Sequence, residues 1–426
     1  HAEVSPANDD PNPMDINTAW WHKRKALQRI YAVPRSAGRQ SAFEAFKEAS
    51  GPDLRAFAAW SVAFEVWGAP WESSWFSETN RDSPEVAALM HEHADLMDFE
   101  CWLQWIAAEQ VNDAQHTALD HGMTLGLMQD MAVGVHGLGA DAGANPERFA
   151  SGGVTVGCPP DFYNQQGQDW SQPPLNPIAL ERTGYKVYRD MVHGKFANAG
   201  AVRIDHILGL FRLWWIPEGK KATDGTYVYY DSDVMLGVLA LEASRAGGVV
   251  IGEDLGVVPP SVSKSLSAPG ILGCAVEWFE QFDGEFRAPN DWRPYALASV
   301  NTHDMPPAAG SLEYGHVKLR EQLGPLSGPV EEFQASATAE HNAMLNMLVE
   351  EGYLDKAALR DELANENEIV DALYRGLQGS PCKLMAASIV DAVGEKRTQN
   401  QTGTHNEYPN RRNQIADGTG NPVPLA

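Results

Sequence analysis

Residues 201–206 read Ala-Val-Arg-Ile-Asp-His, a short apolar run that ends in charged side chains. The pattern recurs at residues 249–256 (Val-Val-Ile-Gly-Glu-Asp-Leu-Gly) and 296–304 (Ala-Leu-Ala-Ser-Val-Asn-Thr-His-Asp). Each run predicts a buried strand, and an acidic side chain at its end is costly to desolvate unless a site uses it. In a βα barrel such strand ends carry the catalytic groups. We therefore expect the three carboxylates to converge on one pocket.

Helical segments alternate with these strands. A helical pattern over residues 185–196 is followed by Asn198-Ala199-Gly200, a glycine stop signal, and then by the strand toward Asp205. A second helical pattern, from Leu236 onward, ends at Gly247-Gly248, directly before the strand toward Glu253. This order, found twice, is typical of parallel βα units in an α/β fold. Further candidate strands are Thr124–Met128, which leads to Asp130, and Val276–Phe279 and Leu384–Val390.

The first 120 residues have a different, helical pattern. Ser41–Glu44 fits a capping box, Asp53 is placed to open a second helix, and Ser83-Pro84 is typical of a third helix start. Aromatic residues between Met97 and Ala114 recur at helical spacing and predict a packed core. We expect a helical subdomain over residues 1–120 and the alternating strands and helices over residues 121–426.

Composition narrows the range of partners. The chain has 32 Lys and Arg against 57 Asp and Glu, a net charge of −25. This field repels polyanions, so we expect no binding to nucleic acid or to anionic membranes. No run approaches the ~18 apolar residues of a membrane span, and the N-terminal residues lack a signal-peptide core. Four widely spaced cysteines favour reduced thiols, so we expect a cytoplasmic protein.

The carboxylates suit the cleavage of a glycosidic bond. Arg203 precedes Asp205 by two residues, so both point to one face of a strand, and the cation keeps Asp205 ionised for nucleophilic attack. Glu253 and Asp254 point to opposite faces, so one can enter a pocket while the other holds the loop. A carboxyl separation of about 5–5.5 Å would give retention and about 6.5–9.5 Å inversion. The residues alone leave that choice open.

Other chemistries find little support. His206, His303 and Asp304 could bind a metal, but the chain has no HExxH motif and no Asp-rich calcium loop. No GxGxxG follows a strand, and no GxxxxGK[ST] or GxSxG occurs. We therefore expect neither a metal nor a nucleotide cofactor.

Taken together, the sequences around Asp205, Glu253 and Asp304 resemble those of the 4-α-glucanotransferases (amylomaltases, disproportionating enzymes) of the α-amylase clan. Pro159–Phe162 followed by Gly167–Trp170 is similar to the family's PPD…GQxW segment. Leu213–Pro217 is similar to its WxIP segment, and Gln399-Asn400 resembles the segment after its last barrel strand. The resemblance runs from about residue 18 to residue 412.

This resemblance implies a TIM (β/α)8 barrel with a large helical insertion over residues 1–120. The barrel would lack its first two strands in this chain, because residues 121–426 supply strands three to eight. Six strands leave two unpaired edges, so we expect the natural protein to carry an upstream extension with two more strands.

The resemblance also implies roles. Asp205 would be the nucleophile, Glu253 the acid/base, and Asp304 the group that stabilises the oxocarbenium-like transition state. The predicted substrate-binding residues are Arg203, His303, Trp170, Asp130 and Asp254, with Trp170 on an active-site loop. No cofactor or metal is implied.

The predicted function is retaining transfer of α-1,4-glucan segments, with maltooligosaccharides and glucose as donors and acceptors. A hydrolase of the same clan would carry the same three acids. A third possibility is a non-catalytic glucan-binding fragment. Transfer is the leading hypothesis, and the presence of Asp205, Glu253 and Asp304 argues against the non-catalytic fragment.

Overall fold

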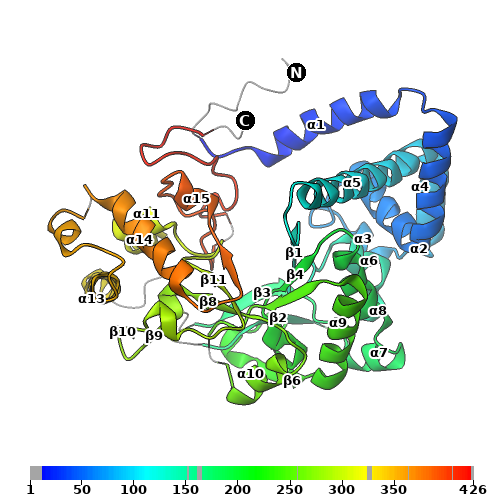
Figure 1. The fold of residues 1–426 in the computed structure, drawn as a ribbon. Helices are drawn as coiled ribbons and strands as arrows, with labels where there is room; N and C mark the ends of the chain where they lie inside the picture. Colours follow the sequence, from blue (N-terminus) through cyan, green and yellow to red (C-terminus); the bar gives the residue numbers. More distant parts are fainter. Residues whose placement is uncertain are drawn as a thin grey trace. The chain divides into compact units, whose positions relative to one another are not determined.

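The computed structural model describes residues 12–150, 153–160, 166–256, 258–323, 329–362, 364–404 and 406–423. The chain divides into two compact units (Figure 1). One unit is Ala26–Ile271, and the other joins His1–Lys25 to Leu272–Ala426. The boundary predicted at residue 120 is a different one, and it stays a prediction.

A three-stranded parallel sheet lies at the centre of the Ala26–Ile271 unit. Its order is β1 (Met128–Met131), β4 (Ala201–Ile204), β7 (Val249–Gly252). The strands predicted before Asp205 and Glu253 are confirmed. The strand predicted at Thr124–Met128 begins only at Met128, so Asp130 lies inside β1.

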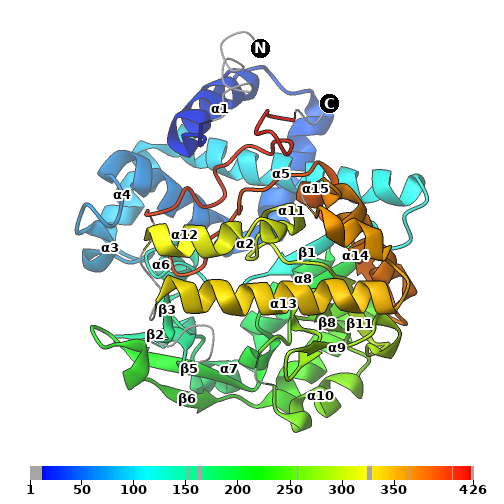
Figure 2. The same cartoon turned by 90° about the vertical axis from the view of Figure 1, so that its left-hand side faces the viewer.

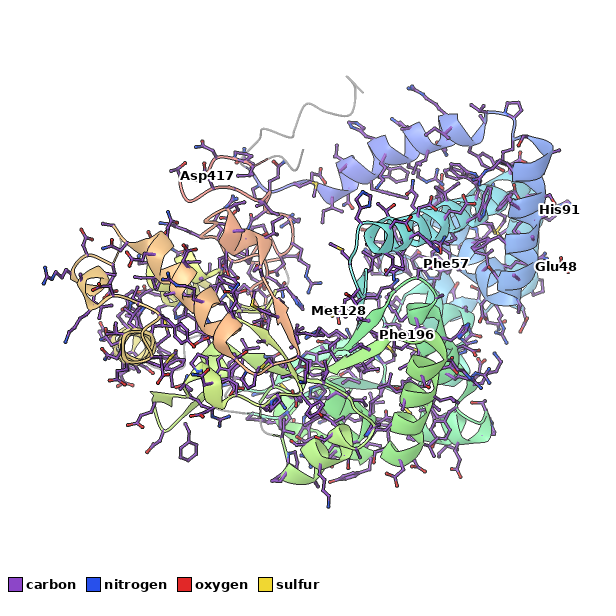
Figure 3. The ribbon with its side chains drawn as sticks, in the orientation of Figure 1. Glu48, Phe57, His91, Met128, Phe196 and Asp417 are labelled. Carbon is purple, nitrogen blue, oxygen red and sulfur yellow. The ribbon has the colours of Figure 1, made fainter. Side chains whose placement is uncertain are left out.

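Two helices, α8 (Lys186–Phe196) and α9 (Ser232–Ala246), pack against this sheet (Figure 1). The Asp231 side chain caps the start of α9 by accepting the Val234 N–H, and Gly247 ends the helix in the left-handed conformation. At the end of α8, Phe196 lies beside the sheet (Figure 3) in one apolar cluster with Val202. Local caps thus set the helix ends, and apolar burial holds the helices on the sheet.

Gly200 does not have the role predicted for it. Helix α8 already ends at Phe196, and Gly200 does not adopt a positive φ. A Cβ atom at this position would lie 1.9 Å from the Leu125 carbonyl oxygen. Gly200 is therefore needed because two chain segments approach closely just before β4, and not as a helix cap.

The helical part of this unit contains α2 (Ala37–Trp67), α4 (Pro84–Glu92) and α5 (Ala94–Asp120), preceded by α1 (Ile16–Tyr31). The capping box at Ser41–Glu44 is wrong, because Ser36 caps α2 and Ser41 lies within it. The break expected before Asp53 is present as a kink at Gly51, where φ is 63°. The aromatic core is confirmed: the buried set includes Phe43, Phe99, Trp102 and Trp105.

An antiparallel sheet that the sequence analysis did not predict stands beside the parallel one. Its order is β3 (Gln168–Gln172), β2 (Val154–Cys158), β5 (Arg212–Pro217), β6 (Thr226–Tyr229). Of the family-like segment at Pro159–Phe162, Asp161 and Phe162 lie outside the described residues. The smaller elements of this unit are α3 (Trp75–Glu78), α6 (Ala140–Ala144), η1 (Pro146–Arg148), α7 (Pro177–Arg182), η2 (Ile207–Leu210), η3 (Ala222–Asp224) and α10 (Pro260–Ser267).

The second unit has its own parallel sheet, in the order β12 (Leu384–Ala386), β11 (Ala296–Ser299), β8 (Gly273–Val276). The strand before Asp304 is confirmed. The strand predicted at Val276–Phe279 is wrong by three residues, because β8 ends at Val276 and the 3-10 turn η4 (Glu277–Phe279) follows. The strand predicted at Leu384–Val390 has only its first three residues in β12.

Helices α13 (Val330–Glu350) and α14 (Glu366–Gly379) share the apolar core of this sheet (Figure 2). Their buried faces supply Met344, Leu348, Ile369 and Leu373, which cluster with Ala298 of β11. The remaining elements are β9 (Gln281–Phe282), β10 (Glu285–Phe286), η5 (Pro289–Asp291), α11 (Ala308–Leu312), α12 (Gly315–Leu323), η6 (Lys356–Arg360) and α15 (Ile389–Ala392).

Two further expectations concern the whole chain. Within the described ranges, no helix combines the length and the apolar character needed to cross a membrane. The four cysteines are all among the described residues, and no disulfide joins them.

Glu277, directly after β8, is a buried carboxyl group whose lost hydration is not replaced by hydrogen bonds from the described residues. Its side chain is 1% exposed, and neither carboxyl oxygen has a hydrogen-bond partner within the described part of the chain. Burial, helped by the charge of Glu280, raises the pKa of Glu277 to about 8. The folded protein then holds a proton that the unfolded chain loses above pH ~4.5. Stability should fall by about 1.4 kcal/mol per pH unit between pH ~4.5 and ~8.

We expect Glu277→Gln to remove this pH dependence, because the amide does not ionise. Thermal unfolding followed by circular dichroism should give the variant a higher Tm than the wild type at pH 8, and a smaller difference at pH 5. The matched control is Glu285→Gln on an exposed strand residue, which should leave the slope unchanged. Equal slopes for wild type and Glu277→Gln would contradict this account.

Candidate functional site

The parallel register places Asp205 and Glu253 next to each other. Ile204 at the end of β4 pairs with Gly252 at the end of β7, and each acid is the next residue. The pairing continues through them, since the Glu253 N–H donates to the Ile204 carbonyl at 2.9 Å. Equivalent positions on neighbouring parallel strands point to the same face and lie about 4.8 Å apart. The two acids therefore lie side by side at the carboxyl ends of β4 and β7.

Arg203 connects the first two strands through its guanidinium. Its Nη1 donates to Asp130 Oδ1 at 2.8 Å and Oδ2 at 3.0 Å, and to Asp205 Oδ1 at 2.9 Å. Burial opposes the charged form, but the hydrogen bonds and charges of the two acids outweigh it and raise the pKa of Arg203. The side chain, 14% exposed, thus stays a cation between two carboxylates.

Glu253 is held by the main chain. Its Oε2 accepts the His206 N–H at 2.9 Å, and its Oε1 accepts the Leu255 N–H at 2.7 Å. Burial raises the pKa of Glu253 above its ordinary value, and the charge of Asp205 adds to this. The two backbone hydrogen bonds and the Arg203 charge act in the opposite direction without cancelling the rise. Glu253 is therefore poised to hold a proton.

His206 forms the turn between these two acids. It adopts the left-handed conformation, with φ of 45°, which directs its N–H to Glu253 while Ile207 N–H bonds the Glu253 carbonyl at 2.9 Å. Burial lowers the pKa of His206, which favours its neutral form. Its ring meets Trp170 edge to face, with centroids 5.4 Å apart. Trp170 lies within strand β3 and not on a loop as predicted.

Two other predicted residues of this unit have different surroundings. Asp130 is half exposed and contacts Arg203, and its carbonyl accepts a hydrogen bond from Lys195 Nζ at 3.0 Å. Asp254 is only 7% exposed, in contrast to Asp205, whose side chain is 35% exposed.

The second unit holds the remaining predicted pair, which follows β11. Asp304 Oδ2 lies 3.3 Å from His303 Nε2, and its Oδ1 accepts a hydrogen bond from Asn400 Nδ2 at 2.5 Å. Arg411 approaches the same oxygen at 3.9 Å with its side chain largely exposed. The Asp304 carboxylate is therefore oriented by an amide and an imidazole at the carboxyl end of its strand.

The predicted residues thus fall into two sets. Trp170, Asp130, Arg203, Asp205 and Glu253 are linked directly or through His206, whereas His303 and Asp304 form a pair within the other unit. Convergence of all three acids stays a prediction.

Two polar residues at the site were not predicted to be part of it. A left-handed turn at His206 has only a weak sequence signal, because residues other than glycine rarely adopt a positive φ. Asn400 had a sequence signal, because Gln399-Asn400 belongs to a segment that resembles the family. No cluster of three or more His, Cys, Asp or Glu side chains in the described residues is arranged to hold a metal ion.

Comparison with known proteins gives a consistent picture. A family profile described as 4-alpha-glucanotransferase matches residues 1–417. The 4-alpha-glucanotransferase of Mycobacterium tuberculosis is 48% identical over 422 residues, which are 98% of this chain and 58% of that protein. The 4-alpha-glucanotransferase of Haemophilus influenzae is 34% identical over 343 residues, 80% of this chain and 48% of that protein.

Solved structures agree. The crystal structure of amylomaltase from Corynebacterium glutamicum has a TM-score of 0.88 at 37% identity, covering 99% of this chain and 59% of that one. Amylomaltase from Streptococcus agalactiae in complex with acarbose has a TM-score of 0.74 at 16% identity, covering 96% and 77%, and shows the shared fold alone.

The chain spans 58% of the length of its mycobacterial relative. Over 98% of the chain is matched by that relative's sequence, and 99% by the fold of the Corynebacterium glutamicum amylomaltase. The chain therefore belongs to the 4-alpha-glucanotransferase family.

Proposed function

We propose that the protein is a retaining 4-α-glucanotransferase that moves α-1,4-glucan segments between maltooligosaccharides. The observation that carries this proposal is the pair of neighbouring strand ends. Asp205 is hydrogen-bonded to the partly buried guanidinium of Arg203, while Glu253 is bonded by backbone amides and has a raised pKa. Two carboxyl groups whose environments differ in this way are suited to act as nucleophile and as acid.

The chemistry takes two steps. Asp205 attacks the anomeric carbon of the donor, and Glu253 gives its proton to the departing sugar oxygen as the glycosidic bond breaks. The 4-hydroxyl of an acceptor then loses its proton to Glu253 and attacks the same carbon, which releases Asp205. Retention needs carboxyl groups about 5–5.5 Å apart. The shared register of Asp205 and Glu253 on adjacent strands supports this spacing over the wider inverting arrangement.

The other residues have supporting roles in this proposal. Arg203 offsets the charge of Asp205 and fixes its orientation through Asp130. His303, Asp130, Asp254 and Trp170 would contact the bound sugar. Asp304 would stabilise the positive charge that develops on the ring, and Asn400 would orient it. No role falls to a metal or cofactor.

We also propose that the two parallel sheets are strands three to eight of a TIM (β/α)8 barrel. Each sheet has three parallel strands in chain order, with the polar residues at their carboxyl ends. Residues 1–120 would be the helical subdomain inserted into this barrel, and residues 121–426 would carry the strands and active-site loops.

A hydrolase of the same clan is the second candidate, since it would use the same acids with water as acceptor. Transfer is favoured by Trp170, whose ring packs on His206 directly beside the two acids. An apolar surface there can hold an acceptor sugar and exclude water.

Maltotriose as the sole substrate tests transfer. We expect glucose together with oligosaccharides longer than maltotriose, all with α-configured new bonds, because the intermediate is passed to a sugar. Chromatography and NMR of the products from the whole natural protein provide the measurement. Glucose and maltose without any longer product would show a hydrolase.

We expect Asp205→Asn to lower kcat by several orders of magnitude, because the amide forms no glycosyl intermediate. Steady-state kinetics on maltotriose give the value, and the circular dichroism spectrum checks the fold. Asp190→Asn on the exposed face of α8 is the matched control and should keep wild-type kcat. A folded Asp205→Asn protein with more than about a tenth of wild-type activity would exclude the nucleophile role.

Glu253→Gln should depend on the leaving group. The amide cannot protonate a sugar oxygen, whereas fluoride needs little protonation. The variant should therefore lose far less activity on α-glucosyl fluoride than on maltotriose, measured as the ratio of the two kcat/KM values. A ratio equal to that of the wild type would assign the acid to another residue, with Asp254 the nearest alternative.

A further inference from the structure

Both ends of the loop that carries His303 and Asp304 donate hydrogen bonds to the same buried carboxylate, that of Asp391. The loop runs from Asn301, after β11, to Ala308, the first residue of α11. Asn301 Nδ2 donates to Asp391 Oδ2 at 2.9 Å, and the Ala308 N–H donates to Asp391 Oδ1 at 2.7 Å. The two oxygens of one side chain thus fix where the loop leaves the sheet and where it joins the helix.

A third donor completes the surroundings of this carboxylate. The Tyr374 hydroxyl, from α14, donates to Asp391 Oδ2 at 2.7 Å and accepts the Ser388 N–H at 3.1 Å. Asp391 itself lies in α15, just after β12, and is 6% exposed. One side chain therefore joins the loop after β11 to the segment after β12 and to α14.

Burial of Asp391 has a cost that these bonds offset. A buried carboxylate is tolerated when donors satisfy its oxygens, and removal of an oxygen leaves buried donors unpaired. All three donors are neutral, so the bonds orient the carboxylate without neutralising it. Such an arrangement stabilises one geometry of the donors more than it stabilises the fold as a whole.

Between its anchored ends, the loop is held mainly by its own turns. Met305 N–H bonds the Thr302 carbonyl at 3.1 Å, and Asp304 N–H bonds Thr302 Oγ1 at 3.3 Å. The Asp304 side chain remains 40% exposed, with its carboxylate turned to Asn400. The direction in which Asp304 points therefore depends on the position of the two ends.

We propose that Asp391 is a positioning residue for the reaction: it holds the 301–308 loop so that Asp304 meets the reacting sugar. The proposal rests on the function proposed above, in which Asp304 stabilises the transition state. Displacement of a reacting group by about 1 Å can cost about 100-fold in rate. Asp391 would therefore affect kcat through Asp304, without touching the substrate.

The test compares Asp391→Asn in the wild type and in an Asp304→Asn background, in the whole natural protein. Turnover is scored as total maltotriose consumed, with α-glucosyl fluoride used for the slowest variants. In the wild-type background we expect kcat to fall about 10–100-fold with KM changed less than about threefold. In the Asp304→Asn background the same change should cost less than about twofold, because the group it positions is already lost.

Two further variants separate positioning from stability. Glu242→Gln in α9 alters another buried carboxylate, which contacts His193 and Arg245, and should lower Tm with kcat retained. Tyr374→Phe and Asn301→Ala each remove one donor and should lower kcat by a smaller factor than Asp391→Asn. They keep the test decisive if Asp391→Asn does not fold.

An unchanged kcat in folded Asp391→Asn, or an equal loss in both backgrounds, would overturn the inference. If only Asp391→Asn misfolds, unchanged kcat in both donor variants would overturn it. Products no longer than maltotriose would contradict the proposed transfer, while the dependence of turnover on Asp391 would still be scored. A wild-type protein that consumes no maltotriose would contradict both.

Discussion

The site in the Ala26–Ile271 unit depends on one partly buried cation, Arg203. The guanidinium of Arg203 lies between the carboxylates of Asp130 and Asp205, with three nitrogen–oxygen distances of 2.8–3.0 Å. The guanidinium is largely removed from water, so its charge needs these carboxylates as partners, whereas the two carboxylates remain partly exposed. The same pairing joins β1 to β4 through side chains as well as through the sheet. The hydrogen bond between Arg203 and Asp205 therefore also fixes the orientation of Asp205, the proposed nucleophile.

The parallel register of β4 and β7 places a second acid, Glu253, next to Asp205. Asp205 and Glu253 follow paired residues of β4 and β7, so the backbone places them side by side. Their surroundings then diverge, since Asp205 accepts a hydrogen bond from a guanidinium and Glu253 accepts hydrogen bonds from backbone amides. The left-handed turn at His206 allows this, because it directs an N–H back to Glu253. In the other unit, Asp304 and Asp391 show a similar division between an exposed acid and a buried acid that holds the loop.

The strands that lead to the acids could be predicted, because a short apolar run before a charged residue depends on local sequence alone. The antiparallel sheet of β2, β3, β5 and β6 was missed. Its strands are short, and the pairing of β2 with β5 joins segments that lie far apart in the chain, so these segments become a sheet only by pairing with one another. The capping box at Ser41 failed for a related reason. Ser36 offered an earlier start, and the burial of Phe43 within α2 favoured the longer helix.

The sequence by itself determined the α/β class, the helical N-terminal part, the strand-end acids and the family, because these follow from apolar patterns and from strings of neighbouring residues. Only the tertiary structure decided which groups each acid meets. The hydrogen bond from Arg203 to Asp130 joins residues 73 apart. The backbone N–H of His206 donates to Glu253 at the end of the neighbouring strand, and Asp391 accepts the N–H of Ala308, 83 residues away. Hydrogen bonds and desolvation act over a few ångströms in space. The properties of each carboxyl group therefore depend on neighbours that the chain brings together only when it folds.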